Sequence, residues 1–254
     1  MLGRPDYMDN DTITFQLATH FLSRIALRLE FLFKTINQAC YESHEVIHRF
    51  ALKHIIEIVD VIEKPELKSR FLKELIRIEH VLKKGNLLKN RLFDNLATQI
   101  HVLNHVPGRF SNSIHNDEFL KTLRQIHHPN TKECEFNSPH LVLWFNSDPL
   151  LRQKTITQWM NCLKDLEQTV TIYLSLLRET TQYIPIIAYN GFHQHSLSPK
   201  SVNHLILLKM DKTMEIVPKL QLGHHNLTIR LYELSTTQEV RDKTVDMEIA
   251  FCQI

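Results

Sequence analysis

The sequence predicts an α+β protein in which the helices come first and the strands come last. Apolar residues recur with a helical period over most of residues 20–180, and this period is lost beyond residue 182. Short apolar or alternating runs follow, separated by turn-forming dipeptides such as Asn190-Gly191. Helices and strands that are segregated along the chain are typical of the α+β class. We therefore expect an N-terminal and central α-helical domain and a β-rich domain formed mainly by the C-terminal strands.

The first predicted elements are one strand and a series of helices. Polar and apolar residues alternate over residues 12–17, which places Ile13, Phe15 and Leu17 on one face of a short strand. Pro65 suits the first turn of a helix, because a proline there removes no intrahelical hydrogen bond. The helices are expected at about 20–42, 44–64, 65–84, 87–104 and 116–128, followed by two between 148 and 180 that meet near Cys162.

Most of the strands are expected in the C-terminal part of the chain. An earlier compact apolar run, Leu141–Phe145, also favours a strand. Apolar residues alternate in Leu227–Tyr232, which points Arg230 to the face opposite Ile229. The other late strands are predicted at 183–189, 202–208 and 245–252, with turns at Asn190-Gly191 and Leu222-Gly223.

These elements predict two domains. A helical domain covers residues 20–180 and is the expected site of dimerisation, because several of its helices have broad apolar faces. A β-rich domain covers residues 181–254. The strands near 12–17 and 141–145 are expected to join its sheet.

The composition is that of a soluble globular protein. Of the 254 residues, 43% are hydrophobic and 23% are charged, and the net charge of +2 is too small to argue for nucleic-acid binding. No apolar stretch approaches the ~20 residues of a membrane helix, and the N-terminus lacks the apolar core of a signal peptide. The four cysteines are scattered without a C-x-x-C, which predicts reduced thiols in the cytoplasm. The five glycines form no nucleotide-binding or nucleophile-elbow motif, so nucleotide enzymes and α/β-hydrolases are disfavoured and no cofactor is expected.

One segment, His44-Glu45-Val46-Ile47-His48, contains the zinc-protease motif H-E-x-x-H. In that motif two histidines share a helix face and bind zinc, while the glutamate activates a bound water. Metzincins end the helix with a glycine where this chain has Ala51, and here the apolar pattern continues past that position. On such a continuous helix His54 cannot reach a metal held by His48. We therefore expect no metal here, and a zinc metalloprotease stays as the alternative function, with Glu63 or Glu66 as third ligand.

Two arginines interrupt a helix that is otherwise apolar almost all round. The helix is predicted over residues 21–33, and such a helix is normally buried in a core or an interface. Arg24 and Arg28 lie four residues apart on one of its faces, where like charges repel by roughly 0.2–0.5 kcal/mol. This pair calls for an acidic partner, which belongs either to this chain or to another molecule.

Six short segments of the chain form a pattern of specific order and spacing. They are Leu27–Leu32, Phe71–Leu75, Cys134-x-Phe136 followed by Trp144, Asn190–Phe192, Ile229-Arg230 and Asp246–Cys252. Together they resemble the ZapD family, the Z-ring-associated bacterial division proteins. The resemblance covers residues from about 24 to 252.

The resemblance implies a cytoplasmic homodimer that acts at the midcell division site and has no catalytic activity. Such proteins bind the short, charged C-terminal tail of FtsZ and crosslink FtsZ filaments into bundles, with no role for nucleic acid or membrane. The implied mechanism is physically coherent, because a symmetric dimer presents two copies of one site and can bridge two filaments. Arginines suit an acidic tail because they make bidentate bonds to carboxylates.

The resemblance also implies which residues bind the tail. Arg28 and Arg230 match basic positions of the family, and Arg24 matches a third. Two positions depart from the pattern, because Asn226 and Glu118 stand where basic residues are expected. We expect His224, His225 or Lys219 to supply part of the basic patch instead, and Arg28 and Arg230 to face a shared, partly open groove. The residues taken without the resemblance support a generic α+β scaffold that binds an acidic partner.

Overall fold

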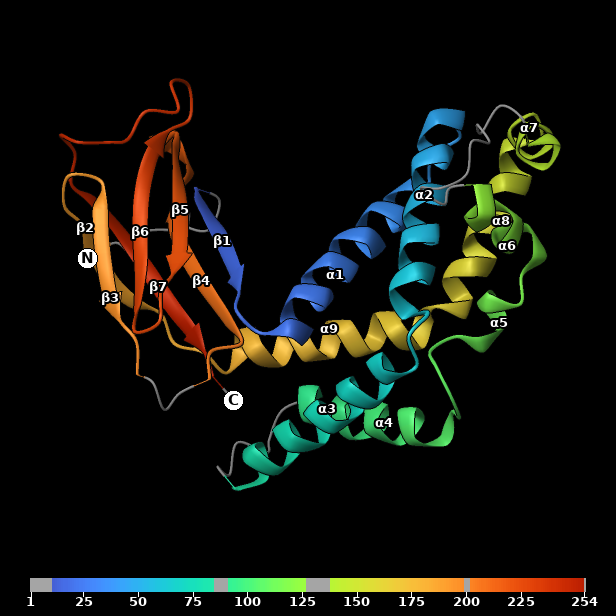
Figure 1. Cartoon of the computed structure of the whole chain (residues 1–254), viewed down its shortest axis with the longest axis horizontal. Coiled ribbons are helices and arrows are strands. Elements are labelled where there is room, and N and C mark those ends of the chain that lie inside the picture. The colour runs from blue at the N-terminus through green and yellow to red at the C-terminus, as the bar shows by residue number, and fades with distance from the viewer. Residues whose placement is uncertain (1–10, 85–90, 127–137, 199–201, 254) are drawn as a thin grey trace, which may run out of the picture. The chain divides into compact units, whose positions relative to one another are not determined.

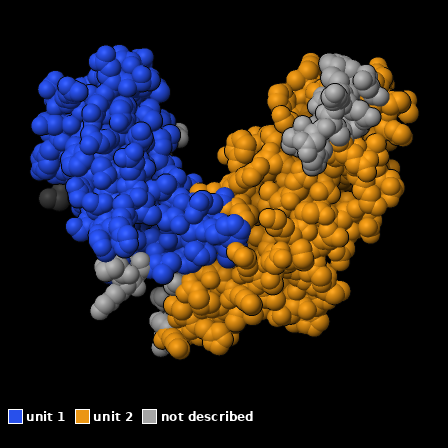
Figure 2. Space-filling view, in the orientation of Figure 1, with its two compact units in different colours: residues 1–24, 176–254 blue, residues 25–175 orange. Residues whose placement is uncertain are grey.

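The computed structural model describes residues 11–84, 91–126, 138–198 and 202–253, and it confirms the α+β class (Figure 1). The chain divides into two compact units. One comprises residues 25–175, and the other comprises residues 1–24 together with 176–254 (Figure 2). The helices lie in the first unit or run across its boundaries, and the strands lie in the second. Among the described residues, no helix combines the length and apolar character needed to cross a membrane.

The helices follow the predicted order closely. They are α1 Phe21–Ala39, α2 Glu45–Ile62, α3 Glu66–Lys84, α4 Arg91–His105, α5 Asn112–His115, α6 Glu118–Ile126, α7 Pro139–Phe145, α8 Pro149–Cys162 and α9 Lys164–Glu179. Asp117 caps α6, because its carboxylate accepts from the Leu120 amide at 2.9 Å. The predicted break near Cys162 is confirmed, since α8 ends there and α9 begins two residues later. Residues 85–90, which follow α3, lie outside the described residues.

The core of the helical unit is built from the apolar faces of these helices. Phe71 of α3 and Tyr173 of α9 are fully buried, and their rings meet edge to face at 5.7 Å between centroids. Leu29 and Ile36 of α1 are also fully buried. The core therefore buries only one face of α1. The opposite face, which includes Phe31 at 63% exposure, is exposed in the single chain, and its burial in an interface stays a prediction.

The strand predicted at Leu141–Phe145 is also wrong, because this segment forms the short helix α7. Ser138 precedes it as N-cap, with its hydroxyl accepting from the Leu141 amide, and Pro139 occupies the first turn. Leu141 and Phe145 are buried while Val142 and Leu143 between them are exposed. Buried residues four apart form a helical stripe, so the apolar run belongs to a helix and contributes no strand to a sheet.

The second unit contains two antiparallel sheets. The four-stranded sheet has the order β1-β4-β7-β2, and the three-stranded sheet has the order β3-β6-β5. The strands are β1 Thr12–Ala18, β2 Ile184–Ala188, β3 Phe192–Ser196, β4 Leu205–Asp211, β5 Ile216–Leu222, β6 Asn226–Glu233 and β7 Val245–Cys252. Inward side chains of both sheets, such as Ile249 of β7 and Ile229 of β6, form one apolar core.

Two of these strands, β3 and β5, are not predicted by the sequence. β3 is the polar segment Phe192–Ser196, which has no apolar alternation. β5 contains Pro218, which cannot donate to a neighbouring strand and is tolerated because β5 is at the edge of its sheet. The turn predicted at Asn190-Gly191 joins β2 to β3, and both of its residues have positive φ, at 51° and 70°.

Candidate partner-binding site

Arg230 lies at the centre of the exposed face of the three-stranded sheet. It projects from β6 into solvent while its neighbour Ile229 is fully buried, which confirms the alternation predicted for this strand. The strand register places Phe192 of β3 opposite Arg230 on one side and Lys219 of β5 opposite it on the other. Side chains of directly paired residues share a face of the sheet. The three side chains therefore form one row across the sheet.

Direct contacts fix the position of the Arg230 guanidinium. Its central carbon lies over the Phe192 ring, 5.3 Å from the ring centroid, in a cation–π arrangement. Its Nη1 donates to the carboxylate of Glu239 at 2.5 Å. The arginine side chain is still 44% exposed, so it presents donors to solvent on one side and rests on an aromatic ring on the other.

The next row of the same sheet face adds apolar groups. Val217 of β5 pairs with Tyr232 of β6, so both share the face with Arg230. Val217 is 39% exposed and Tyr232 is half-buried. We call Phe192, Val217, Lys219, Arg230 and Tyr232 the sheet patch. It combines two cations with an apolar and aromatic floor.

The two histidines predicted to support Arg230 lie at the far end of the same hairpin. His224 and His225 are exposed in the β5–β6 turn, with their ring centroids 4.5 Å apart. Asn226, which stands where a basic residue was expected, begins β6 and accepts from the Gly223 amide with its backbone carbonyl at 2.8 Å. Asn226 precedes Arg230 by four positions along the strand, which corresponds to about 13 Å. Of the residues expected to replace the missing basic position, Lys219 therefore adjoins Arg230 in the described sheet, whereas His224 and His225 lie at the other end of the hairpin.

Arg24 and Arg28 both lie on the exposed face of α1, as their spacing predicts. Arg28 is 58% exposed, and its Nε donates to the Glu57 carboxylate of α2 at 2.7 Å. The acidic partner required by this pair is thus supplied for Arg28 by the chain itself. Within the described residues, Arg24 has no ion-pair partner. One turn beyond Arg28, Phe31 is 63% exposed and contacts the His54 ring edge to face.

The basic residues therefore form two surfaces, one on the exposed face of α1 and one on the sheet. Arg28 belongs to the helical unit and Arg230 to the strand unit. The groove that we expect them to share stays a prediction. Glu118 lies on α6 and pairs with Lys121 of the next turn at 2.7 Å, so this exposed position carries an internally paired carboxylate.

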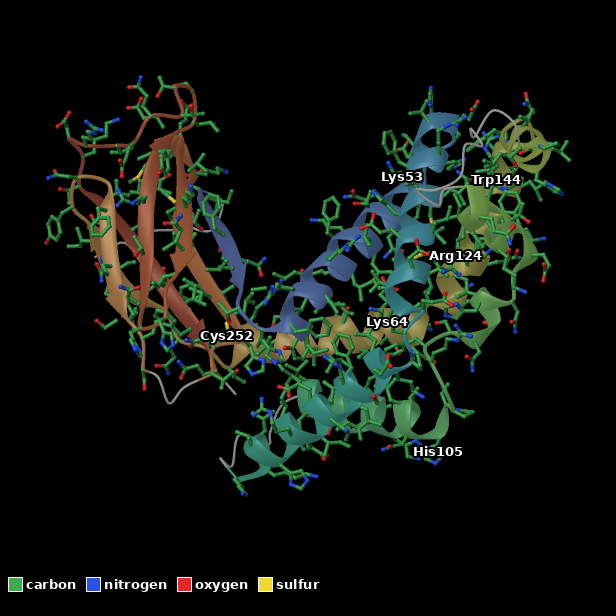
Figure 3. All side chains as sticks on the ribbon, viewed as in Figure 1. Lys53, Lys64, His105, Arg124, Trp144 and Cys252 are labelled. Carbon is green, nitrogen blue, oxygen red and sulfur yellow. The ribbon has the colours of Figure 1, made fainter. Side chains whose placement is uncertain are left out.

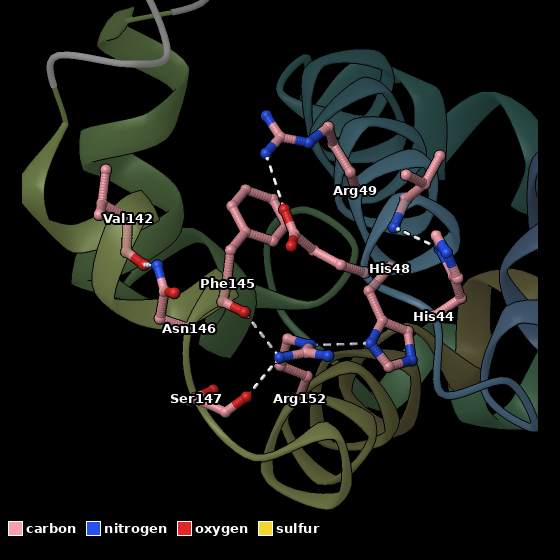
Figure 4. Close-up of polar contacts among 10 residues, drawn as sticks. His44, His48, Arg49, Val142, Phe145, Asn146, Ser147 and Arg152 are labelled. Atoms are coloured by element: carbon pink, nitrogen blue, oxygen red, sulfur yellow. Dashed lines mark hydrogen bonds and ion pairs between the residues drawn. The ribbon is translucent and has the colours of Figure 1, made fainter.

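The two histidines of the H-E-x-x-H motif have structural contacts instead of a shared open ligand face (Figure 4). His44 precedes α2 as its N-cap, with Nδ1 accepting from the Val46 amide at 3.2 Å. His48 is fully buried, and its Nδ1 accepts from Arg152 Nε at 3.0 Å while Nε2 lies 2.8 Å from the Glu42 carbonyl oxygen. Both ring nitrogens of His48 are thus engaged. Burial lowers the pKa of His48 below its ordinary 6.5, which agrees with a neutral ring that accepts from an arginine.

Two carboxylates that would serve a zinc site, those of Glu45 and Glu63, are engaged in ion pairs. Glu45 pairs with Arg49 on α2 at 3.1 Å. Glu63 pairs with Arg109 at 3.2 Å and with Arg124 of α6 at 2.7 Å. Figure 3 labels Arg124. Among the described residues, no group of three histidine, cysteine, aspartate or glutamate side chains is placed to hold a metal. The geometry gives the motif a role in helix capping and core packing.

Comparison with known proteins gives the family. A sequence model of the ZapD family, described as "Cell division protein", matches residues 27–230, which is most of the chain. The chain belongs to the ZapD family. The matched span contains Arg28, Lys219 and Arg230, whereas Arg24 lies just outside it.

Individual ZapD proteins are similar along almost their whole length. The cell division protein ZapD of Coxiella burnetii is 26% identical over 247 residues, covering 94% of this chain and 96% of the relative. The ZapD of Nitrosomonas eutropha is 26% identical over 253 residues and is covered completely, with 95% of this chain aligned. The ZapD of Cupriavidus necator is 28% identical over 237 residues, covering 90% of this chain and 92% of the relative.

Two contacts of Arg230 in this ZapD protein are not predicted by the sequence. Phe192 occurs in one of the segments that resemble the family, but its position under Arg230 follows from the pairing of β3, a strand the sequence does not predict. Glu239 lies between the predicted strands, and nothing in the sequence indicates that it pairs with Arg230. Both contacts depend on register between segments that are separate along the chain.

Proposed function

We propose that this ZapD protein binds the C-terminal tail of FtsZ and, as a homodimer, crosslinks FtsZ filaments to stabilise the Z ring at midcell in the cytoplasm. The observation that carries the proposal is the sheet patch, where Arg230 rests on Phe192 beside Lys219. The family's role in cell division supports it.

The chemistry of the sheet patch fits a short, acidic and partly apolar segment. An arginine offers a planar fork of donors that matches a carboxylate, and Lys219 adds a second positive charge on the neighbouring strand. Phe192, Val217 and Tyr232 offer apolar area to side chains that flank the acidic groups. A flexible tail loses conformational entropy on binding, and charge-assisted hydrogen bonds together with apolar burial offset that cost.

The exposed face of α1 is the second basic surface of the proposal. Arg24 and Arg28 lie on one face of α1, followed by the exposed ring of Phe31. This repeats the combination found on the sheet patch, in which a cation lies beside an aromatic side chain. We propose that Arg28 and Arg230 make the main contacts with the tail and that Arg24, Lys219 and His224 support them.

The first experiment is co-sedimentation of FtsZ filaments with this protein. Intact FtsZ is expected to carry the protein into the pellet and to form bundles, and FtsZ that lacks its C-terminal tail is expected to do neither. Equal co-sedimentation with both forms of FtsZ would place the binding site elsewhere on the filament and end the tail-binding proposal.

The second experiment measures binding of a fluorescent FtsZ tail peptide to single variants. Arg230→Glu is expected to lower the affinity at least tenfold, because loss of a charge-assisted hydrogen bond costs ~1.5–3 kcal/mol. Lys154→Glu is the matched control, since Lys154 is an exposed residue of α8 and its reversal changes the net charge by the same amount. Binding by wild type should also weaken as salt rises, because exposed charges are screened beyond ~8–10 Å near physiological ionic strength. Equal effects of the two charge reversals would show that net charge, and not Arg230, determines the affinity.

A further inference from the structure

The segment between β6 and β7 runs back along β6. It lies on the same side of β6 as β3, beyond Phe192, the first residue of β3. We call residues 234–244 the strap. The Val240 amide donates to the Leu231 carbonyl at 2.9 Å, and the Glu233 amide donates to the Gln238 carbonyl at 2.9 Å. The strap residue Glu239 also forms an isolated β-bridge with Tyr232. These backbone bonds fix the strap to the strand that carries Arg230.

Side-chain packing holds the strap in the same place. Val240 is 4% exposed and belongs to the apolar core of the two sheets. Gly191, in the turn before β3, donates to the Lys243 carbonyl at 3.2 Å. A Cβ at Gly191 would lie 2.1 Å from the Val240 carbonyl oxygen, so only glycine allows this close approach. The carboxylate of Glu239 is therefore carried on a backbone that is fixed at both sides.

Glu239 places a carboxylate directly on the guanidinium of Arg230. Its Oε1 accepts from Arg230 Nη1 at 2.5 Å, and the glutamate side chain is 29% exposed. The pair lies at the rim of the sheet patch, next to the Phe192 ring that supports the same guanidinium. Lys219, on the opposite side of Arg230, is exposed and has no ion-pair partner among the described residues. The chain thus already presents to Arg230 the chemical group that an acidic partner would bring.

We infer that Glu239 is an internal competitor, which occupies Arg230 in the free protein and gives way to a carboxylate of an acidic peptide partner. This inference rests on the proposed function, because the competitor acts at the site proposed for the tail. Loss of the Glu239 pair offsets part of the affinity that a partner's carboxylate gains at Arg230. A partner that also contacts Lys219 or the apolar floor of the sheet patch is therefore favoured. Glu239 in this way disfavours ligands that offer a single carboxylate and nothing else.

The test compares Glu239→Gln with wild type in binding two fluorescent peptides, the FtsZ tail and an oligoglutamate of equal length. Glu239→Gln is expected to bind both peptides roughly two- to fivefold more tightly, the range set by release of an exposed ion pair. The gain is expected to be larger for oligoglutamate, which lacks apolar groups for the floor of the sheet patch. Glu233→Gln is the matched control, because Glu233 adjoins the strap and lies 4.0 Å from Lys243. It removes the same charge and should leave both affinities unchanged.

A double-mutant comparison separates a direct effect from a general change in charge. In an Arg230→Gln background, Glu239→Gln is expected to give no gain, because the competitor no longer has a cation to occupy. An equal gain in affinity in that background, or in Glu233→Gln, would overturn the inference. The effect would then come from the overall electrostatic field of the protein. Unchanged binding by Glu239→Gln would also overturn it. Weaker binding would mean that Glu239 positions Arg230 for the partner instead of competing with it.

The two probes keep this inference distinct from the proposed function. If Glu239→Gln binds oligoglutamate more tightly and the FtsZ tail binds to no variant, competition by Glu239 is confirmed and the proposed partner is wrong. If the tail binds to wild type and Glu239→Gln changes neither affinity, the proposed function stands and the competitor is wrong. Melting temperatures of all variants are expected to match wild type closely, since an exposed pair contributes little to stability.

Discussion

At the scale of single residues, Arg152 of α8 is a buried cation that the described structure surrounds with neutral acceptors. Its Nε donates to His48, and its Nη1 donates to the Phe145 carbonyl at 2.7 Å and to the Ser147 carbonyl (Figure 4). Its Nη2 reaches the Ser43 carbonyl at 3.3 Å. A protonated His48 could not accept from Arg152 and would add a second positive charge to the same site. The H-E-x-x-H motif therefore contributes one neutral histidine to the core, and this neutrality makes the core sensitive to acid.

Acidification is expected to destabilise the fold through His48. Burial holds the native pKa of His48 below its ordinary 6.5, so below pH 6.5 the unfolded chain binds the proton more readily than the native protein. The stabilisation from a neutral His48 is fully present above pH 6.5 and is lost as pH falls through the native pKa. His48→Gln should remove part of this acid sensitivity. The measurement is the free energy of unfolding in urea for both proteins between pH 7.5 and 5. Parallel pH curves would show that His48 does not contribute to the acid response.

The sequence predicts the exposure of the candidate site residues, but it does not predict their ion-pair partners. The alternation of β6 correctly exposes Arg230, because a strand has a period of two and Ile229 must enter the core. The i, i+4 spacing of Arg24 and Arg28 correctly places them on one face of α1. Glu57 and Glu239, which pair with two of these arginines, are not predicted. An ion pair between elements depends on tertiary packing, which leaves no periodic trace in a single sequence.

At the scale of elements, α7 shows how a cap can outweigh an intrinsic preference. Leu141–Phe145 contains residues that favour strands, but Ser138 and Pro139 before it supply a helix N-cap and first turn. β3 and β5 show the opposite case, because their own sequences are weak strand signals. Both become strands by pairing with β6, whose alternating pattern is strong.

Ser138→Ala is expected to destabilise the protein by about 0.5–2 kcal/mol, because the Leu141 amide loses its cap while buried near the start of α7. Ser138→Thr and Ser138→Asn retain an accepting oxygen and should restore most of that free energy. The measurement is urea denaturation of the three variants and wild type. If the alanine and asparagine variants have the same stability, the hydroxyl of Ser138 does not cap α7.

The Arg28–Glu57 pair joins α1 to α2 and offers a matched test of the α1 surface. Arg28→Ala and Glu57→Gln both remove this ion pair, which at 58% and 31% side-chain exposure contributes at most about 1 kcal/mol after solvent screening. Only Arg28→Ala removes the cation proposed to bind the tail. We expect similar melting temperatures for both variants but about tenfold weaker tail-peptide binding for Arg28→Ala alone. Equal tail affinities in the two variants would limit Arg28 to its internal pair with Glu57.

At the scale of the whole molecule, the proposed crosslinking requires two binding sites that are held together. One chain carries one sheet patch, so the second patch must come from another copy. A symmetric dimer provides two identical patches, and its helical part has apolar side chains exposed on its surface, including Phe50 of α2 and Leu143 of α7. Binding of one filament by one patch raises the effective concentration of the second patch near a neighbouring filament. Bundling should therefore depend on intact dimers far more steeply than tail binding does.

Mixing wild type with an excess of Arg230→Glu tests this dependence. After subunit exchange at a threefold excess of the variant, about one-sixteenth of random dimers carry two intact patches. Bundling, measured by light scattering of FtsZ filaments, is expected to fall well below one-quarter of the level given by the same total concentration of wild type. Tail-peptide binding should fall only in proportion to the number of intact patches. Lys154→Glu mixed at the same ratio is the control and should leave bundling unchanged, since it alters an exposed lysine of α8. If bundling instead falls no further than peptide binding, each chain must act alone, and crosslinking by a dimer is wrong.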